Sequence, residues 1–74
     1  MENLKMKVFH NALVLYNTLC EIGRSSFSQL QKTTGLGDSD LCFAICFLLQ
    51  NKTISQSKIN GVIYYEVLIL HRKL

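Results

Sequence analysis

The 74-residue sequence contains no proline and no tryptophan, and its four glycines all lie after residue 22. Proline and glycine are the strongest interrupters of regular structure, so residues 4–22 are free to form one long helix. Apolar runs are also short, and none approaches the roughly 20 residues that a membrane-spanning helix needs. The sequence therefore predicts a protein that does not span a membrane.

Cysteine is scarce, and its pattern argues against stabilisation by disulfides. The three cysteines are odd in number and all lie in segments with helical spacing, whereas disulfide scaffolds use even sets. No secretory signal is visible, because polar residues interrupt the apolar stretch that follows Lys5 and Lys7. We therefore expect a cytoplasmic protein whose thiols stay reduced.

The sequence also lacks a convincing set of metal ligands. Cys42 and Cys46 stand at i and i+4, a spacing that could place two thiolates on one metal ion. The other residues that could complete such a site do not stand at metal-motif spacing: Cys20, His10 and His71. We expect no metal site, and we interpret the cysteines as small apolar packing residues.

Motifs for catalysis are missing in the same way. Gly35-Leu36-Gly37 lacks the third glycine and the preceding strand of a phosphate-binding loop. No serine, cysteine or carboxylate near His10 in the sequence suggests a catalytic unit. We expect no enzymatic activity, no cofactor and no small-molecule substrate.

What the chain has in abundance is apolar side chains. Its length predicts a single domain over residues 1–74, with a core from about 4 to 70 and a basic tail at 71–74. Hydrophobic residues make up 49% of the chain and the mean hydropathy is +0.20, both high for a small domain. Such a composition predicts apolar surface that a partner shares. The net charge of +3 permits nucleic-acid binding without demanding it.

Apolar residues recur at helical spacing in two long segments. The first runs from Leu4 to Ile22, and its expected buried face is Val8, Ala12, Leu15, Tyr16 and Leu19, broadened by Phe9, Leu13 and Cys20. The second runs from Asp38 to Lys52, with Asp38 or Ser39 as N-cap, and its expected buried face is Leu41, Ala44, Ile45, Leu48 and Leu49. The opposite face of this second helix is also apolar and carries Cys42, Phe43, Cys46 and Phe47. A helix that is apolar all round is covered on both sides, by its own domain or by a partner.

Shorter elements fill the rest of the chain. Ser28 is the expected N-cap of a short helix at 29–34, with Gln31 completing a capping box, and Phe27 is either a hydrophobic staple or part of a very short strand. Strand-like alternation predicts a hairpin from strands at 53–56 and 62–70, joined by a loop at 57–61 with an Asn-Gly turn. The predicted fold class is mainly α with a small β-hairpin (α+β). Its expected single core contains Leu30, Leu36, Leu41, Ile45, Leu48 and Ile63.

Three helices followed by a hairpin resemble a winged helix-turn-helix domain. Four local motifs stand out along the chain: Asn11-Ala12, Leu19-x-Glu21-x-Gly23, Leu30-x-Lys32-x-Thr34-Gly35-Leu36 and Asp40-Leu41-x-x-Ala44. Through these motifs the sequence resembles, over about residues 8–69, a family of small bacterial winged-helix proteins of uncharacterised function. In the wider superfamily the third helix enters the major groove of DNA and the wing touches the backbone or minor groove. The resemblance implies a winged-helix DNA-binding transcriptional regulator as an alternative function.

The third helix departs from that pattern. Its first turn carries Asp38 and Asp40, and no lysine or arginine occurs between Lys32 and Lys52, whereas base readout relies on basic and amide side chains. We expect DNA binding to be weak, through residues available for contact with phosphates or bases: Gln29, Lys32, Ser39, Lys52, Lys58 and Asn60. We expect instead a homodimer or a complex with another protein. The predicted interface is Phe43, Cys46, Phe47 and Gln50 on the third helix, extended by Leu68 and Leu70.

Overall fold

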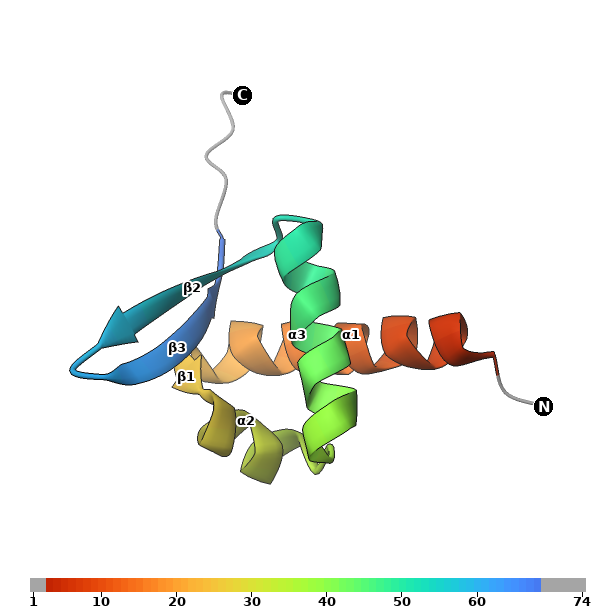
Figure 1. Ribbon diagram of the computed structural model, residues 1–74, viewed down its shortest axis with the longest axis horizontal. Helices are drawn as coiled ribbons and strands as arrows, with labels where there is room; N and C mark the ends of the chain where they lie inside the picture. Colours follow the sequence, from red (N-terminus) through yellow and green to blue (C-terminus); the bar gives the residue numbers. More distant parts are fainter. Residues whose placement is uncertain (1–2, 69–74) are drawn as a thin grey trace.

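Three helices and three strands follow one another in the order α1, β1, α2, α3, β2, β3 (Figure 1). The structure is a computed structural model, and it describes residues 3–68. The bounds are α1 Leu4–Ile22, β1 Ser25–Ser26, α2 Phe27–Thr34, α3 Asp38–Gln50, β2 Ile54–Ile59 and β3 Val62–Val67. The strands form one antiparallel sheet in the order β1-β3-β2. The prediction of an α+β fold with three helices is confirmed, while the sheet has one strand more than expected.

Helix α1 has the bounds that the sequence predicted. The Asn3 side chain caps its start and accepts a hydrogen bond of 2.8 Å from the backbone N–H of Lys5. Gly23 ends the helix with φ of 81°, a conformation that favours glycine, and its N–H donates to the carbonyl of Leu19.

Helix α2 begins earlier than predicted, because Ser26 rather than Ser28 is its N-cap. The Ser26 hydroxyl accepts from the Gln29 N–H at 3.3 Å, and the Gln29 side chain accepts from the Ser26 N–H at 2.9 Å. The sequence offers the capping-box pattern twice, at 26–29 and at 28–31. The pairing of Ser26 with Tyr64 in the sheet holds Ser26 in the extended conformation that an N-cap requires, which decides between the two. Phe27 is consequently the first residue of the helix.

Helix α3 has Gly37 at its N-cap, so the expectation that Asp38 or Ser39 caps it was wrong. Asp38 instead accepts a hydrogen bond from the side-chain amide of Gln31 on α2. The two aspartates of the first turn still lie at the positive end of the helix dipole. The helix ends at Gln50, and Lys52 follows it with φ of 59°.

The hairpin is longer on its first strand than predicted. Strand β2 reaches Ile59, which pairs with Val62, so the predicted loop at 57–61 shrinks to a turn at Asn60 and Gly61. Both turn residues have positive φ, 52° and 82°, as a tight two-residue hairpin turn requires. The last two residues of the predicted strand 62–70 lie outside the described residues.

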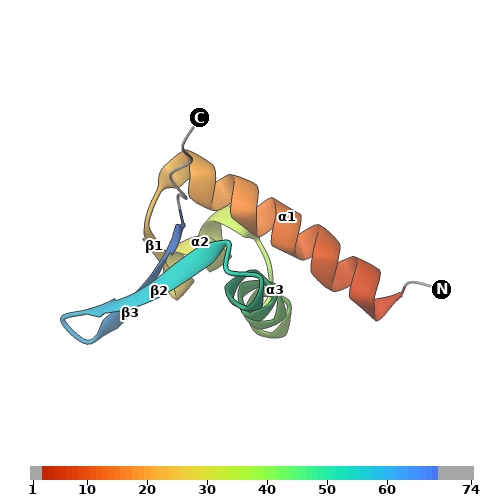
Figure 2. The same ribbon diagram turned by 90° about the horizontal axis from the view of Figure 1, so that it is seen from above.

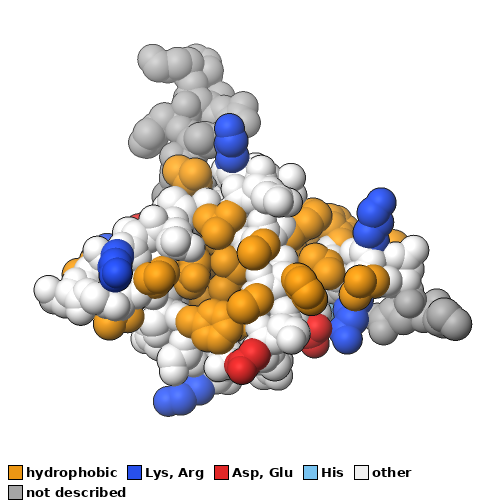
Figure 3. All heavy atoms as spheres, viewed as in Figure 1, with side chains coloured by type: hydrophobic (Ala, Val, Ile, Leu, Met, Phe, Trp, Pro, Cys, Tyr) orange, Lys and Arg blue, Asp and Glu red, His pale blue; other side chains and the backbone are white. Residues whose placement is uncertain are grey.

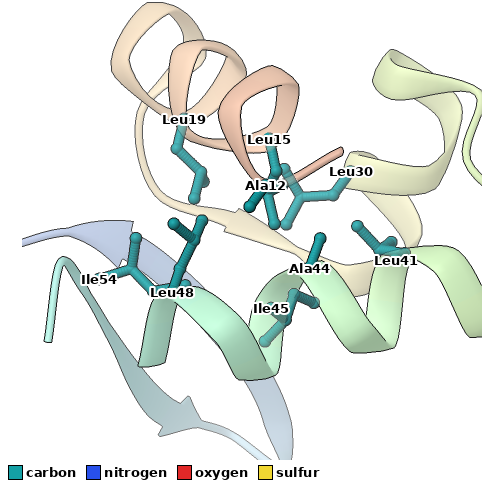
Figure 4. Close-up of a cluster of buried hydrophobic side chains, with 9 residues drawn as sticks. All are labelled: Ala12, Leu15, Leu19, Leu30, Leu41, Ala44, Ile45, Leu48 and Ile54. Atoms are coloured by element: carbon teal, nitrogen blue, oxygen red, sulfur yellow. The ribbon is translucent and has the colours of Figure 1, made fainter. Parts of the chain in front are cut away.

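The hydrophobic core lies where α1, α2 and α3 meet the base of the sheet (Figure 4). Its buried members are Ala12, Leu15, Leu19, Leu30, Leu41, Ala44, Ile45, Leu48 and Ile54. Leu36 and Leu49, both expected in the core, are half-buried at its edge. Ile63 was also expected there but is 38% exposed, because it faces an open pocket between β3 and the start of α2 rather than the core.

The burial of Leu48 generates a stability prediction. Leu48 is 5% exposed and joins α3 to the core, and truncation of a buried leucine typically costs about 2–5 kcal/mol. We expect Leu48→Ala to lower the melting temperature sharply. The matched control Leu4→Ala should change it little, because Leu4 is 68% exposed. An unchanged melting temperature for Leu48→Ala would contradict the assignment of this core.

Candidate interaction surface

The exposed side of α3 is apolar, as the sequence predicted. Leu41, Ala44, Ile45 and Leu48 point into the core. The side chains left exposed on the other side are Ser39, Cys42, Phe43, Cys46 and Gln50. The Phe43 ring is 54% exposed. Hydrophobic side chains spread from the hairpin across α3 to α1 on this side of the molecule (Figure 3).

Phe47 differs from the prediction, because it is half-buried and packs against the core. Its ring meets that of Phe9 on α1 edge to face, with centroids 6.0 Å apart and planes at 75°, a favoured arrangement of two aromatic rings. The domain itself therefore covers part of Phe47, which the sequence predicted to lie in an interface with a partner. Phe47 links the exposed side of α3 to α1.

Helix α1 contributes apolar surface that the sequence analysis assigned to the core. Phe9 is 49% and Leu13 is 47% exposed, and Cys20 is also exposed. Met6, which was assigned to no buried face, is exposed as well. The physical reason is that a helix buries one stripe against its neighbours, here the stripe of Ala12, Leu15 and Leu19. Phe9 and Leu13 lie on a second stripe beside the buried one. The sequence indicates this second stripe only by an apolar face that is too broad for a single helix contact to bury.

The two helices enclose an apolar groove of about 400 Å³. Its lining residues are Phe9, Leu13, Tyr16, Phe47, Leu48, Asn51 and Thr53. We refer to the exposed or half-buried residues Met6, Phe9, Leu13, Phe43 and Phe47 as the α1/α3 face. A half-exposed ring leaves on the order of 100 Å² of area open to water, so this face amounts to an apolar patch of several hundred Å².

The charged residues nearest to this face come from the same two helices. Lys7 Nζ on α1 lies 3.7 Å from the Asp40 carboxylate on α3, and both side chains are well exposed. Such a pair adds little to stability in water. It does fix which flank of α3 faces α1, namely the flank that carries Asp40 and Phe47.

The remaining predicted interface residues are less well placed. Leu68 is exposed at the end of the sheet, and its N–H donates to the carbonyl of Thr53 at 2.9 Å, so its backbone adjoins the Thr53 end of the groove. Gln50 lies exposed at the end of α3. Leu70 lies outside the described residues.

The residues predicted to contact nucleic acid come from separate segments of the fold. The side chain of Gln29 is engaged in the capping box of α2. The others are exposed and lie in five different places: Lys32 on α2, Ser39 on α3, Lys52 in the turn after it, Lys58 on β2 and Asn60 at the hairpin tip. Arg24, which the sequence analysis did not select, lies 5.7 Å above the ring of Tyr64, a cation–π contact.

All three cysteines are free thiols and exposed, so the interpretation of them as packing residues was wrong. Cys42 and Cys46 lie on the side of α3 that faces Tyr65 of β3. Burial raises the pKa of Tyr65 above its ordinary value of 10.0, and the charges of these two thiols raise it further. Within residues 3–68, no group of three or more potential metal ligands comes together.

Comparison with known proteins supports the fold alone. No protein-family model matches the chain, and no curated protein matches it. The structure is similar to the solution NMR structure of protein BT2368 from Bacteroides thetaiotaomicron, a structural genomics target. The TM-score is 0.79 at 20% sequence identity, over 95% of this chain and 96% of that one. None of the helices in the described part of the chain is long and apolar enough to cross a membrane.

The environment of Tyr65 predicts how stability depends on pH. Because its folded-state pKa is raised, its contribution to stability is complete below pH 10 and is lost as the pH rises through the folded-state pKa. Selective ¹³C labelling of tyrosine would follow this titration by NMR. Cys42→Ser with Cys46→Ser should move the Tyr65 pKa down toward 10.0 without reaching it, because burial remains. A Tyr65 pKa at or below 10.0 in the folded wild-type protein would contradict this environment.

Proposed function

We propose that this chain is a non-catalytic winged helix-turn-helix module that binds another protein surface through its α1/α3 face, and that it associates with a second copy of itself. The observation that carries the proposal is the apolar surface left open on α1 and α3 by a domain that is already packed. Phe43, Phe9 and Leu13 are each about half exposed, while α1 and α3 bury other apolar side chains in the core.

The order of the elements supports the winged-helix assignment. A short α2, a turn with glycines at positions 35 and 37, and α3 form a helix-turn-helix pattern. A hairpin follows at once, and its two strands extend away from the helices as a wing would (Figure 2). The small strand β1 joins the hairpin to the start of α2.

The free energy of burial supports a protein partner. Moving a side chain such as Phe, Leu or Met from water into an interface contributes roughly 1.5–3 kcal/mol when burial is complete. Aromatic side chains near the centre of an interface are the usual dominant contributors to binding. A second copy is the simplest partner, because most soluble oligomers are symmetric homo-oligomers.

The same surface argues against sequence-specific reading of DNA by α3. The groups it presents are thiols, a phenylalanine ring, Ser39 and Gln50, and its first turn carries two aspartates that phosphates would repel. Lys32, Lys52 and Lys58 remain available for contacts with phosphates, which need only positive charge.

Sedimentation velocity over a wide concentration range tests the proposed self-association. We expect the mass of the wild-type protein to rise from one copy to two. The double variant Leu13→Ser, Phe43→Ser should remain monomeric and folded, since both side chains are already half hydrated. The matched control Ile22→Ser, Ile59→Ser replaces two exposed apolar residues outside the face and should still associate. A wild-type protein that stays monomeric throughout would contradict self-association.

DNA titrations at several salt concentrations test the nucleic-acid alternative. We expect weak binding without sequence preference, with an affinity that falls steeply as salt increases. Ser39→Ala and Gln50→Ala should leave it unchanged, because neither side chain reads a base. Tight, sequence-selective binding at physiological salt that either substitution abolishes would instead support a DNA-binding regulator.

A further inference from the structure

We infer that the second copy binds by antiparallel pairing of α3 with α3, so that Phe43 of each copy enters the groove between α1 and α3 of the other. This inference rests on the proposed self-association and specifies its geometry. The groove and the ring that fills it belong to the same surface, so each copy completes a site that the other leaves open.

The positions of the ring and the groove on α3 agree with this pairing. Asp40 and Phe47 lie on the flank of α3 that faces α1, as the ion pair with Lys7 and the ring contact with Phe9 establish. Phe43 stands three residues after Asp40 and four before Phe47, which places it on the same flank. The projecting ring and the groove are therefore about 6 Å apart along one helix.

A two-fold axis that passes between the two copies of α3 at the level of Ile45 brings ring and groove together. The axis lies in the plane of the interface and runs perpendicular to the helices, so the two copies of α3 are antiparallel. In this arrangement the flank of α3 that faces α1 lies on the same side of the dimer in both copies. Positions 43 and 47 are equally distant from Ile45, so Phe43 of one copy meets Phe47 and the adjoining groove of the other. A parallel arrangement would turn Phe43 toward the flank of Cys42 and leave the groove empty.

The same axis makes the charges complementary. Asp38 and Lys52 stand seven residues before and seven residues after Ile45, so the acidic start of one α3 lies at the level of the basic turn that follows the other. The acidic start of each α3 lies beside the C-terminal end of its partner, and the two helix dipoles oppose each other favourably. A parallel pair would instead bring the four aspartates of the two first turns together.

The size of the α1/α3 face is adequate for such a dimer. Its apolar patch of several hundred Å² needs only a polar rim to approach the roughly 800 Å² per partner of a standard interface. Ser39 and Gln50 on the helix and Asn51 directly after it, all exposed, supply that rim. An apolar centre with a polar rim is the usual anatomy of a specific interface.

Single substitutions measured by sedimentation test the role of Phe43. We expect Phe43→Ala to raise the dimer dissociation constant roughly thirtyfold, the effect typical of a dominant interface residue. The matched control Ile22→Ala removes a side chain of similar exposure, 47% against 54%, outside the groove, and should change the constant little. A dimer that Phe43→Ala does not weaken would overturn the inference but leave self-association standing.

Disulfide crosslinking with diamide tests the position of the axis. Cys46 is one residue from Ile45, so the two copies of Cys46 are offset by only about 3 Å along the helices and can meet the geometry of a disulfide. A variant that keeps only Cys46 (Cys20→Ser, Cys42→Ser) should form a covalent dimer rapidly. The matched variant that keeps only Cys42 (Cys20→Ser, Cys46→Ser) should not.

The outcomes of these experiments distinguish a failure of the antiparallel pairing from a failure of the proposed self-association. Rapid crosslinking through Cys42, or none through Cys46 in a protein that sedimentation finds dimeric, would overturn the antiparallel pairing alone. A protein that stays monomeric at every concentration would overturn both the pairing and the proposed self-association.

Discussion

The packing of α1 across α3 is the contact on which the rest of the molecule depends. Ala12 of α1 and Ala44 of α3 are both buried in the core cluster, and such small side chains allow helices to approach closely. Leu15, Leu19, Leu41 and Leu48 fill the space around this crossing. Because each helix buries one stripe there, each leaves its neighbouring stripe uncovered, and the two uncovered stripes meet along the groove. The open apolar surface is thus a direct consequence of how the core is built.

The sequence was sufficient to predict the long-range plan of the fold, since that plan follows from periodicity. The bounds of α1 and the buried side of α3 could be predicted because apolar residues recur at helical spacing over many turns. The start of α2 could not, since two capping-box patterns overlap in the sequence and the pairing of Ser26 with Tyr64 selects one of them. Strand β1 has only two residues and carries no periodic signal of its own. Ile63 was misassigned because alternation along a strand does not reveal which of its positions the core covers.

The α3 part of the interaction surface could be predicted from the sequence, but the α1 part could not. The exposed side of α3, with Phe43 at its centre, could be read from an apolar stripe opposite the core stripe. The share of α1 could not, because a broad apolar face looks the same in sequence whether its second stripe is buried or open. The contact of Phe47 with Phe9 joins residues 38 positions apart, and nothing local in either segment announces it. The exposure of Cys42 and Cys46 likewise depends on where the sheet lies relative to α3.

These features support an account in which a small domain leaves part of its apolar surface for a second copy to cover. Isotope-filtered NMR on a mixture of labelled and unlabelled protein tests that account most directly, because it detects only contacts between copies. The account predicts nuclear Overhauser effects from the Phe43 ring of one copy to the Leu13 methyl groups of the other. Contacts between copies confined to the hairpin, or none at a concentration where the protein is dimeric by sedimentation, would contradict it.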